Sequence, residues 1–223
     1  MEKNKRKQFL VAGLGMFGES VAHTFWEMEY DFIAVDADET IVQAFTDKHP
    51  GSVCYTLDAS NEQALRQLDL KDVDSAVVCI GNMEANMMAT WLLKNTFKVP
   101  RVEAKALNEL HGQMLSKIGA DNIVEAEKNM GERTALNLIS SNVLDYLAFS
   151  KEISIMSVKL PKRFVGLDLI EANLRGKYNI NIVAIKRHGK IIINPNPKEV
   201  FLGEDEIIVV GLRDSIEKFG GTW

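Results

Sequence analysis

Residues 8–36 read QFLVAGLGMFGESVAHTFWEMEYDFIAVD, and this stretch decides the fold of the chain. An apolar run from Phe9 to Ala12 leads into a glycine-rich turn, a helical pattern follows, and a second apolar run ends at Asp36. This order predicts a strand, a phosphate-binding loop, a helix and a second strand. Such a unit is typical of the first half of a doubly wound α/β sheet.

The glycines of the turn, Gly13, Gly15 and Gly18, have the spacing of a dinucleotide-binding fingerprint. The first permits the turn, the second lets the backbone approach a pyrophosphate, and the third lets the helix pack closely on the sheet. The helix N-terminus adds unpaired N–H groups and a partial positive charge. Asp36 stands where a carboxylate accepts ribose hydroxyls and disfavours a 2′-phosphate. The stretch predicts a nucleotide site; the alternative is a loop that only turns the chain.

The composition is that of a globular protein, with 223 residues, 46% apolar content and a net charge of −5. An acidic balance argues against general affinity for nucleic acid, and the basic residues between 3 and 7 read as a short solvated tail. No apolar run approaches the ~18 residues that cross a bilayer, and no signal-peptide core is evident. We therefore expect a cytoplasmic chain. Cys54 and Cys79 lie in apolar runs without CxxC spacing, which favours buried, reduced thiols.

Apolar runs continue to alternate with helical patterns, with strands expected over 52–56, 75–80, 101–105 and 122–124. This alternation predicts a Rossmann-like, doubly wound parallel sheet over residues 1–128. Ligands of such sheets bind outside the carboxyl ends of the strands. The residues expected on this rim, besides the glycine loop and Asp36, are Asp58, Ala59, Ser60, Ile80, Gly81, Asn82, Lys105 and residues 125–127.

Residues 130–149 have a helical pattern whose apolar residues spread over more than one face. One domain surface does not bury such a helix, so we expect a crossover helix and linker over residues 129–150 that forms a dimer interface. The alternative is a helix held between the two domains of one chain.

From residue 151 the pattern changes to short strands, a helix over 167–178 and a hairpin turn at His188 and Gly189. It predicts a separate, small α+β domain over residues 151–223. A module of this size needs a partner to complete its core.

A catalytic function has little support in the residue types. A dehydrogenase needs a general acid or base near the nicotinamide, yet His23, His49 and His111 lie within or beside helices rather than after a strand. We interpret them as surface or hydrogen-bonded histidines. No nucleophile elbow, Walker loop, metal cluster or basic recognition helix is evident. An NAD(H)-dependent oxidoreductase and a redox-sensing dinucleotide-binding protein remain the alternatives.

Several further motifs carry a resemblance to a known family. They are residues 13–18, Val35-Asp36, Asp58-Ala59-Ser60, Ile118-Gly119-Ala120-Asp121, residues 127–131 and residues 185–189. Together with the second module, the chain resembles the cytosolic regulatory subunits of Ktr and Trk potassium transporters. These combine an RCK (KTN) nucleotide-binding domain with a TrkA-C domain. The resemblance implies a non-catalytic gating subunit that forms homodimers and a ring, typically an octamer, beneath a membrane potassium-translocating subunit.

The resemblance also implies ligands. The first domain would bind ATP or ADP, or NAD or NADH, through Gly13, Gly15, Met16, Phe17, Gly18, Asp36, residues 58–60, residues 80–82 and Lys105. Glu127 resembles an acidic residue that coordinates a divalent or monovalent cation with its dimer mate, although Ala126 replaces the usual proline. Many ATP-responsive members carry Arg at the position of Met16, where it contacts a γ-phosphate of the neighbouring subunit. Met16 therefore puts discrimination between ATP and ADP in doubt.

In related proteins the C-terminal domain carries cyclic di-AMP. The matching residues here would supply a phosphate contact from Arg175, a base or phosphate contact from His188, and apolar walls. On residue types alone, a solvated Arg175 and a histidine in a turn is the simpler interpretation. The residues of this predicted second site are Leu169, Asn173, Leu174, Arg175, Ile182, His188, Asn194 and Pro195.

Overall fold

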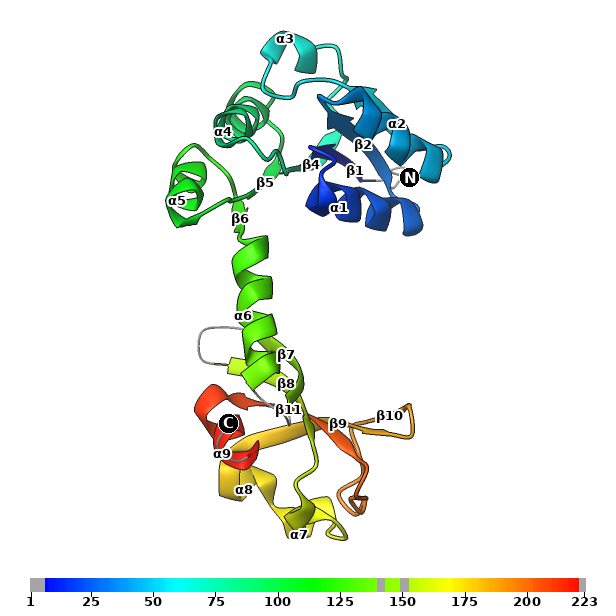
Figure 1. The fold of residues 1–223 in the computed structure, drawn as a ribbon, viewed down its shortest axis with the longest axis vertical. Helices are drawn as coiled ribbons and strands as arrows, with labels where there is room; N and C mark the ends of the chain where they lie inside the picture. Colours follow the sequence, from blue (N-terminus) through cyan, green and yellow to red (C-terminus); the bar gives the residue numbers. More distant parts are fainter. Residues whose placement is uncertain (1–6, 140–142, 149–152, 221–223) are drawn as a thin grey trace, which may run out of the picture. The chain divides into compact units, whose positions relative to one another are not determined.

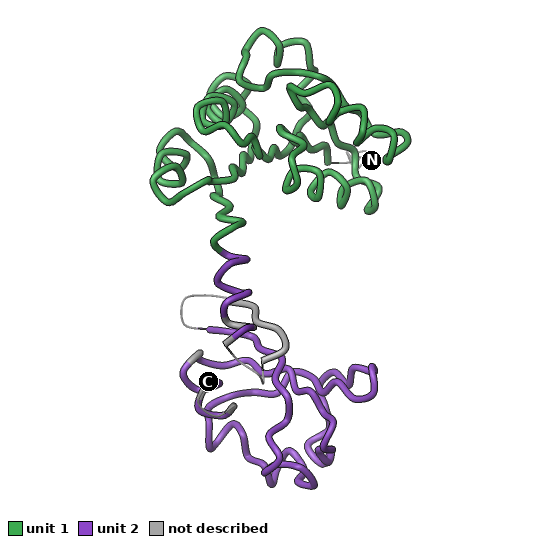
Figure 2. The backbone as a smooth tube through the Cα atoms, viewed as in Figure 1, with its two compact units in different colours: residues 1–128 green, residues 129–223 purple. Residues whose placement is uncertain are grey.

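The computed structural model describes residues 7–139, 143–148 and 153–220, which divide into two compact units (Figure 2). The division falls between Lys128 and Asn129. Figure 1 gives the element labels used below. Among the described residues, no helix is long and apolar enough to cross a membrane.

The first unit is a six-stranded parallel sheet, as the sequence predicts, with strand order β3-β2-β1-β4-β5-β6. The carboxyl ends of all its strands therefore meet at one edge. The strands are β1 (Gln8–Ala12), β2 (Asp31–Asp36), β3 (Val53–Thr56), β4 (Val73–Val78), β5 (Arg101–Lys105) and β6 (Asn122–Val124).

Helices cover both faces of this sheet. Apolar residues of β1 and β2 point alternately to the two sides: Val11 and Ala34 pack with α1 and α2, whereas Leu10 and Ile33 pack in the larger core with the following helices. Burial on both faces explains why the strands read as continuous apolar runs. The helices are α1 (Met16–Glu27), α2 (Glu39–Lys48), α3 (Glu62–Leu65), α4 (Met83–Trp91) and α5 (Glu109–Lys117), with a π-helical turn η1 (Leu92–Thr96) directly after α4.

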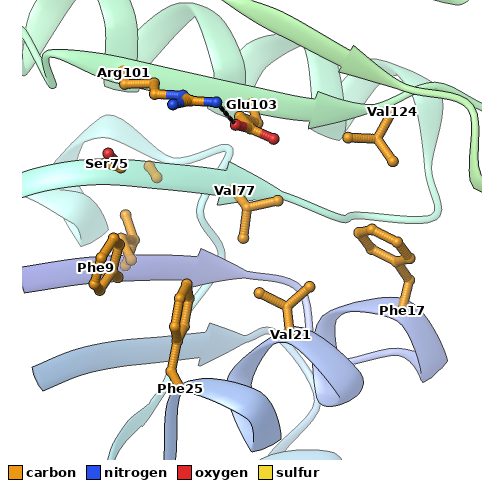
Figure 3. A pocket seen from close by; sticks show the side chains of 11 residues that line it. Phe9, Phe17, Val21, Phe25, Ser75, Val77, Arg101, Glu103 and Val124 are labelled. Carbon is orange, nitrogen blue, oxygen red and sulfur yellow. Dashed lines mark hydrogen bonds and ion pairs between the residues drawn. The ribbon is translucent and has the colours of Figure 1, made fainter. Parts of the chain in front are cut away.

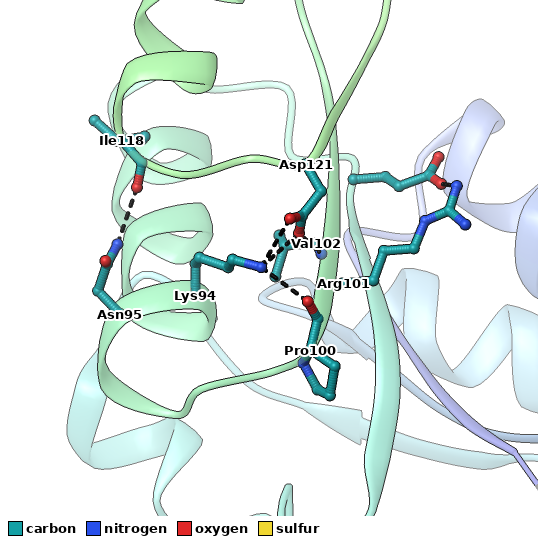
Figure 4. Close-up of polar contacts among 8 residues, drawn as sticks. Lys94, Asn95, Pro100, Arg101, Val102, Ile118 and Asp121 are labelled. Atoms are coloured by element: carbon teal, nitrogen blue, oxygen red, sulfur yellow. Dashed lines mark hydrogen bonds and ion pairs between the residues drawn. The ribbon is translucent and has the colours of Figure 1, made fainter.

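The Ile118–Asp121 motif has a structural role in this unit (Figure 4). Asp121 receives an ion pair from Lys94 at 2.7 Å and a hydrogen bond from the Val102 amide at 2.7 Å. Gly119 adopts a φ of +113°, and a Cβ there would lie 3.0 Å from Cγ of Lys94. The motif thus joins η1, β5 and the segment before β6, which explains its residue types without a ligand.

The second unit contains a five-stranded sheet with strand order β10-β9-β11-β8-β7, and all its pairings are antiparallel. This confirms the predicted small α+β domain. Its core includes Phe164, Phe201 and Phe219. Its elements are β7 (Val143–Ala148), β8 (Ile153–Lys159), η2 (Lys162–Phe164), α7 (Leu169–Ala172), α8 (Leu174–Tyr178), β9 (Ile180–Arg187), β10 (Lys190–Ile193), β11 (Glu206–Leu212) and α9 (Arg213–Gly220).

The predicted helix over residues 130–149 is wrong in its second half. Helix α6 (Ala126–Ile139) ends at Ile139, and residues 143–148 form strand β7, which pairs antiparallel with β8. Residues 140–142 and 149 lie outside the described residues. Hydrogen bonding to β8, a partner later in the sequence, overrides the local helical spacing.

The predicted helix over 167–178 is interrupted. Asn173 adopts the left-handed conformation, with φ of 45°, and separates α7 from α8. Asparagine tolerates this conformation, and its side chain accepts a hydrogen bond from the Gly176 amide at 3.2 Å.

Candidate nucleotide site

The carboxyl ends of strands β1 to β5 surround a cavity of about 510 Å³. Every residue that the sequence assigns to nucleotide contact lines it, except Gly18 and Ser60. Residues 125–127, which the sequence places on the same rim, do not line the cavity. The structure thus brings together residues that are far apart in the chain. The predicted residues on the wall are Gly13, Gly15, Met16, Phe17, Asp36, Asp58, Ala59, Ile80, Gly81, Asn82 and Lys105.

Six further residues line the cavity that the sequence reasoning missed: Val35, Ala37, Ile41, Leu57, Cys79 and Ala85. Most of them directly flank a predicted residue, so adjacency in the chain was the available signal. Ile41 and Ala85 come from the first turns of α2 and α4, which no motif covers.

The glycines of the loop have different roles. Gly13 has a φ of +97°, and its amide donates to the Val35 carbonyl at 2.8 Å. A Cβ on Gly18 would lie 1.8 Å from the Gly13 carbonyl oxygen, so this glycine permits close packing of α1 and does not line the cavity. A Cβ on Gly15 would meet nothing within 4 Å. Packing within the chain therefore does not require glycine at position 15, whereas close approach of a pyrophosphate does.

Helix α1 begins beside the cavity without a side-chain cap, because its N-cap is Gly15. The first N–H groups of a helix have no partner within the helix. They are available to an anion, and the helix dipole favours negative charge there. Met16, the first residue of α1, is 91% exposed. Its thioether adds no charge to this end of the cavity.

Asp36 connects the end of β2 to the glycine loop. Its Oδ2 accepts a hydrogen bond from the Leu14 amide at 2.7 Å, and Oδ1 accepts one from the Asp38 amide at 2.9 Å. These bonds fix the carboxylate at the cavity wall. Each carboxylate oxygen has two lone pairs, so both can still accept a ribose hydroxyl.

The side chains after β3 and β4 are held by local turns. Asp58 Oδ1 accepts from the Ser60 amide at 2.9 Å and from the Ser60 hydroxyl at 2.7 Å. Asn82 caps α4 by accepting from the Ala85 amide at 2.9 Å. Ser60 therefore orients Asp58 from outside the cavity, and the side-chain oxygen of Asn82 is occupied by its own helix.

Lys105 supplies positive charge to the wall. Its ammonium lies 2.5 Å from Oε1 of Glu127 and 5.8 Å from the centroid of the Phe17 ring. The hydrogen bond from Lys105 lowers the pKa of the Glu127 carboxyl, and the charge of Lys105 adds to this. The predicted phosphate-contacting lysine is thus paired with the predicted cation ligand. Within the described residues, no group of three or more His, Cys, Asp or Glu side chains could hold a metal ion.

Three other titratable side chains near the sheet, those of Cys79, His111 and His49, are buried. Burial raises the pKa of the Cys79 thiol to about 12, although the Lys105 charge lowers it slightly, so the thiolate nucleophile is scarce at neutral pH. Burial also lowers the pKa of His111, whose Nδ1 accepts from the Leu107 amide at 3.2 Å. His49 is buried, and its ring contacts the Phe45 carbonyl at 2.8 Å.

A second, smaller cavity of about 260 Å³ lies on the sheet face beside α1 (Figure 3). Phe9, Phe17 and Phe25 supply much of its wall, and an Arg101–Glu103 ion pair of 2.5 Å stands at one end. Apart from Phe17, it contains none of the residues predicted for nucleotide contact.

The residues predicted for a second ligand are spread over α7, α8, β9 and the loops around β10. Leu174 is buried in the core of the second unit, and Ile182 packs against that core. Arg175 is exposed. His188 occupies the hairpin turn with φ of 48°, and its Nδ1 lies 3.4 Å from Glu204. This second site stays a prediction.

Two domain families match the chain: the TrkA-N domain over residues 9–126 and the TrkA-C domain over residues 153–220. The Ktr system potassium uptake protein C of Bacillus subtilis is 39% identical over 215 residues, or 96% of each protein. The Ktr system potassium uptake protein A of the same organism is 35% identical over 220 residues, or 98% of each protein.

Two solved structures share the fold. The GsuK channel bound to NAD has a TM-score of 0.55 and 22% identity, and the match covers 98% of this chain but 39% of the channel chain. The TrkA-N domain of the inner membrane protein ybaL from Escherichia coli has a TM-score of 0.53 and 17% identity, covering 62% of this chain and 100% of that domain.

Proposed function

The chain belongs to the family of Ktr system potassium uptake proteins with successive TrkA-N and TrkA-C domains, and from this premise we propose that it is a nucleotide-binding regulatory subunit of a membrane potassium transporter. The observation that carries the proposal is the similarity to potassium uptake proteins over nearly the whole chain. A cytoplasmic location at the inner face of the membrane, through the transporter, is part of the same proposal.

We propose an adenine nucleotide or dinucleotide as the ligand of the cavity: ATP, ADP, NAD or NADH. The uncapped start of α1 and Lys105 suit phosphates, and the Asp36 carboxylate suits an unmodified ribose. Met16 offers no charged hydrogen bond to a third phosphate. Weak discrimination between ATP and ADP follows.

Regulation without catalysis fits the groups on the wall. Asp36 and Asp58 are held by amides, Cys79 is protonated at neutral pH, and Lys105 is paired. These are properties of a binding site rather than of an acid–base pair. An NAD(H)-dependent oxidoreductase is the alternative function, and steady consumption of NADH by the purified chain would favour it.

We also propose that the chain forms homodimers that assemble into a ring, with an octamer as the first stoichiometry to test. Helices α4 and α5 carry exposed apolar side chains that a second copy would cover: Met88, Trp91, Leu110 and Met114. The part of α6 from residue 129 to residue 139 is the proposed link between the nucleotide-binding domain and the second domain, and the proposed dimer contact, whereas residues 143–148 belong to the sheet of the second unit. A cation held by Glu127 and cyclic di-AMP in the second domain remain predictions within this scheme.

Potassium uptake tests the function directly. Cells that lack the chain should take up potassium more slowly than cells that express it, and the Trp91→Glu variant should behave like the deletion if the α4–α5 surface assembles the ring. Unchanged uptake after deletion contradicts the proposal. A thermal-shift comparison of ATP, ADP, NAD, NADH and cyclic di-AMP on the purified chain identifies the ligand.

A further inference from the structure

Lys105 is the one cationic side chain among the described residues that line the nucleotide cavity. Its side chain is only 15% exposed, whereas that of its partner Glu127 is 69% exposed. The lysine is therefore fixed at the wall, and the glutamate approaches it from outside. Glu127 itself does not line the cavity.

A phosphate that reaches the Lys105 side of this cavity would contact the same ammonium group. An ammonium has three N–H donors but a single charge, and Glu127 already occupies one donor at 2.5 Å. A phosphate beside Lys105 would lie close to the Glu127 carboxylate as well. Two anions beside one cation repel each other, so each weakens the contact of the other.

We propose that Glu127 competes with the phosphate of the ligand for Lys105, and that ligand binding thereby releases the first turn of α6. This inference rests on the proposed nucleotide function of the cavity. Glu127 is in the first turn of α6, which starts at Ala126 and continues past the boundary between the two units. Loss of this ion pair on ligand binding would change the contacts of the first turn of α6, and α6 continues into the segment that connects the units.

The binding of ADP to the full-length chain, measured without divalent cations, tests the competition, because a cation at Glu127 would offset the repulsion between the carboxylate and the phosphate. Glu127→Gln removes the competing charge and should tighten ADP binding by roughly twofold to fivefold, the range expected for loss of one charged contact near the surface. Glu125→Gln is the matched control: it removes the same charge two residues earlier, where the carboxylate pairs with Lys128 at 3.2 Å instead. Glu125 does not line the cavity, so this variant should change ADP affinity by less than about 1.5-fold.

Hydrogen exchange tests the release. In the wild-type chain, saturating ADP should speed exchange of the amides of residues 130–132, whose helical partners are the carbonyls of the first turn of α6. In the Glu127→Gln variant these amides should exchange equally fast with and without ADP, because the charged contact is already absent. An increase in exchange that persists unchanged in the variant contradicts the inference.

The outcomes separate this inference from the proposed function. If the wild-type chain binds ADP and Glu127→Gln binds it equally or more weakly, Lys105 binds the Glu127 carboxylate and the phosphate at the same time. The proposed competition is then wrong, but the nucleotide site is not. If the wild-type chain binds none of ADP, ATP, NAD and NADH, the nucleotide function fails and the competition falls with it.

Discussion

Replacing Asp36 by Ala should remove about half or more of the stabilisation that nucleotides give the protein, yet leave it folded. The Asp36 carboxylate accepts the Leu14 and Asp38 amides at 2.7 and 2.9 Å. In the proposed complex it also accepts ribose hydroxyls. The substitution therefore has two separable effects, one on the stability of the chain and one on ligand affinity.

The two effects differ in size. Loss of the amide contacts at this half-buried position should cost about 1–2 kcal/mol of stability. Loss of hydrogen bonds from the ribose to a charged acceptor, about 1.5–3 kcal/mol, raises Kd by roughly tenfold to a hundredfold. At a ligand concentration of about 100 times the wild-type Kd, binding stabilises the wild-type chain by about 2.7 kcal/mol, which falls to roughly 0.4–1.4 kcal/mol in the variant.

Asp38→Ala is the control for this experiment. It removes the same charge and the cap of α2, where Asp38 accepts the Thr40 amide at 2.8 Å, and should cost about 1 kcal/mol of stability. Asp38 does not line the cavity. In thermal-shift measurements both variants should melt at lower temperature than wild type, but only Asp36→Ala should show a smaller nucleotide-dependent shift. Equal shifts in the two variants would falsify the assignment of Asp36 to the ribose.

Three further predictions follow from individual residues. Gly18→Ala should cost about 3 kcal/mol of stability and lower the melting temperature by roughly 6–12 °C, because the Cβ would lie 1.8 Å from the Gly13 carbonyl oxygen. A Cβ on Gly131 would meet nothing within 4 Å, so Gly131→Ala should not lower it, and equal effects of the two changes would refute the packing argument. Burial raises the pKa of Asp121, but hydrogen bonds from Lys94 and Val102 lower it overall, so the stability from this group is complete above the ordinary pKa near 3.9 and is lost as the pH falls below it. Urea unfolding between pH 6 and about pH 3 should show a shallower loss of stability in Asp121→Asn, and an unchanged slope would contradict this. Met16→Arg should favour ATP over ADP by about tenfold in calorimetric titration, whereas an unchanged ratio would show that position 16 does not contact the third phosphate.

The parallel sheet was predictable because its strands are buried on both faces and its turns have clear residue signals. Leu10 and Val11 are both buried although they point to opposite sides. The apolar run is therefore continuous, and the glycine loop marks its end. Because all strands are parallel, the position of each carboxyl end in the sequence is enough to place residues as distant as Gly13 and Lys105 on one rim.

The second unit was harder to predict in detail because its strands pair with distant partners. Strand β7 depends on hydrogen bonds to β8, and nothing within residues 143–148 distinguishes a strand from a turn or two of helix. The break at Asn173 depends on a single left-handed residue. Asparagine adopts that conformation only in some contexts, so the residue type alone did not predict the break.

The family motifs are of two kinds: those that packing within the chain explains and those that it does not. Residues 118–121 are explained by packing alone, since Asp121 binds Lys94 and Gly119 adopts a positive φ. Gly15 is not explained by packing, because a Cβ there would meet nothing. Gly15 is not required by packing and lies beside an uncapped helix N-terminus, so it is better evidence for a ligand than the motif of residues 118–121.

The partners of the charged groups on the cavity wall indicate where a signal from the ligand leaves the site. Asp36 and Asp58 are held by backbone amides or by a hydroxyl of the adjoining turn, which a ligand can join without displacing. Lys105 is held by a carboxylate on another element, and a phosphate opposes that carboxylate directly. The two acids can therefore bind the ligand without losing their existing contacts, whereas Lys105 must weaken its contact with Glu127 when the ligand binds. Because Glu127 belongs to α6, detection at Lys105 changes the start of the one helix that continues from the first unit into the second.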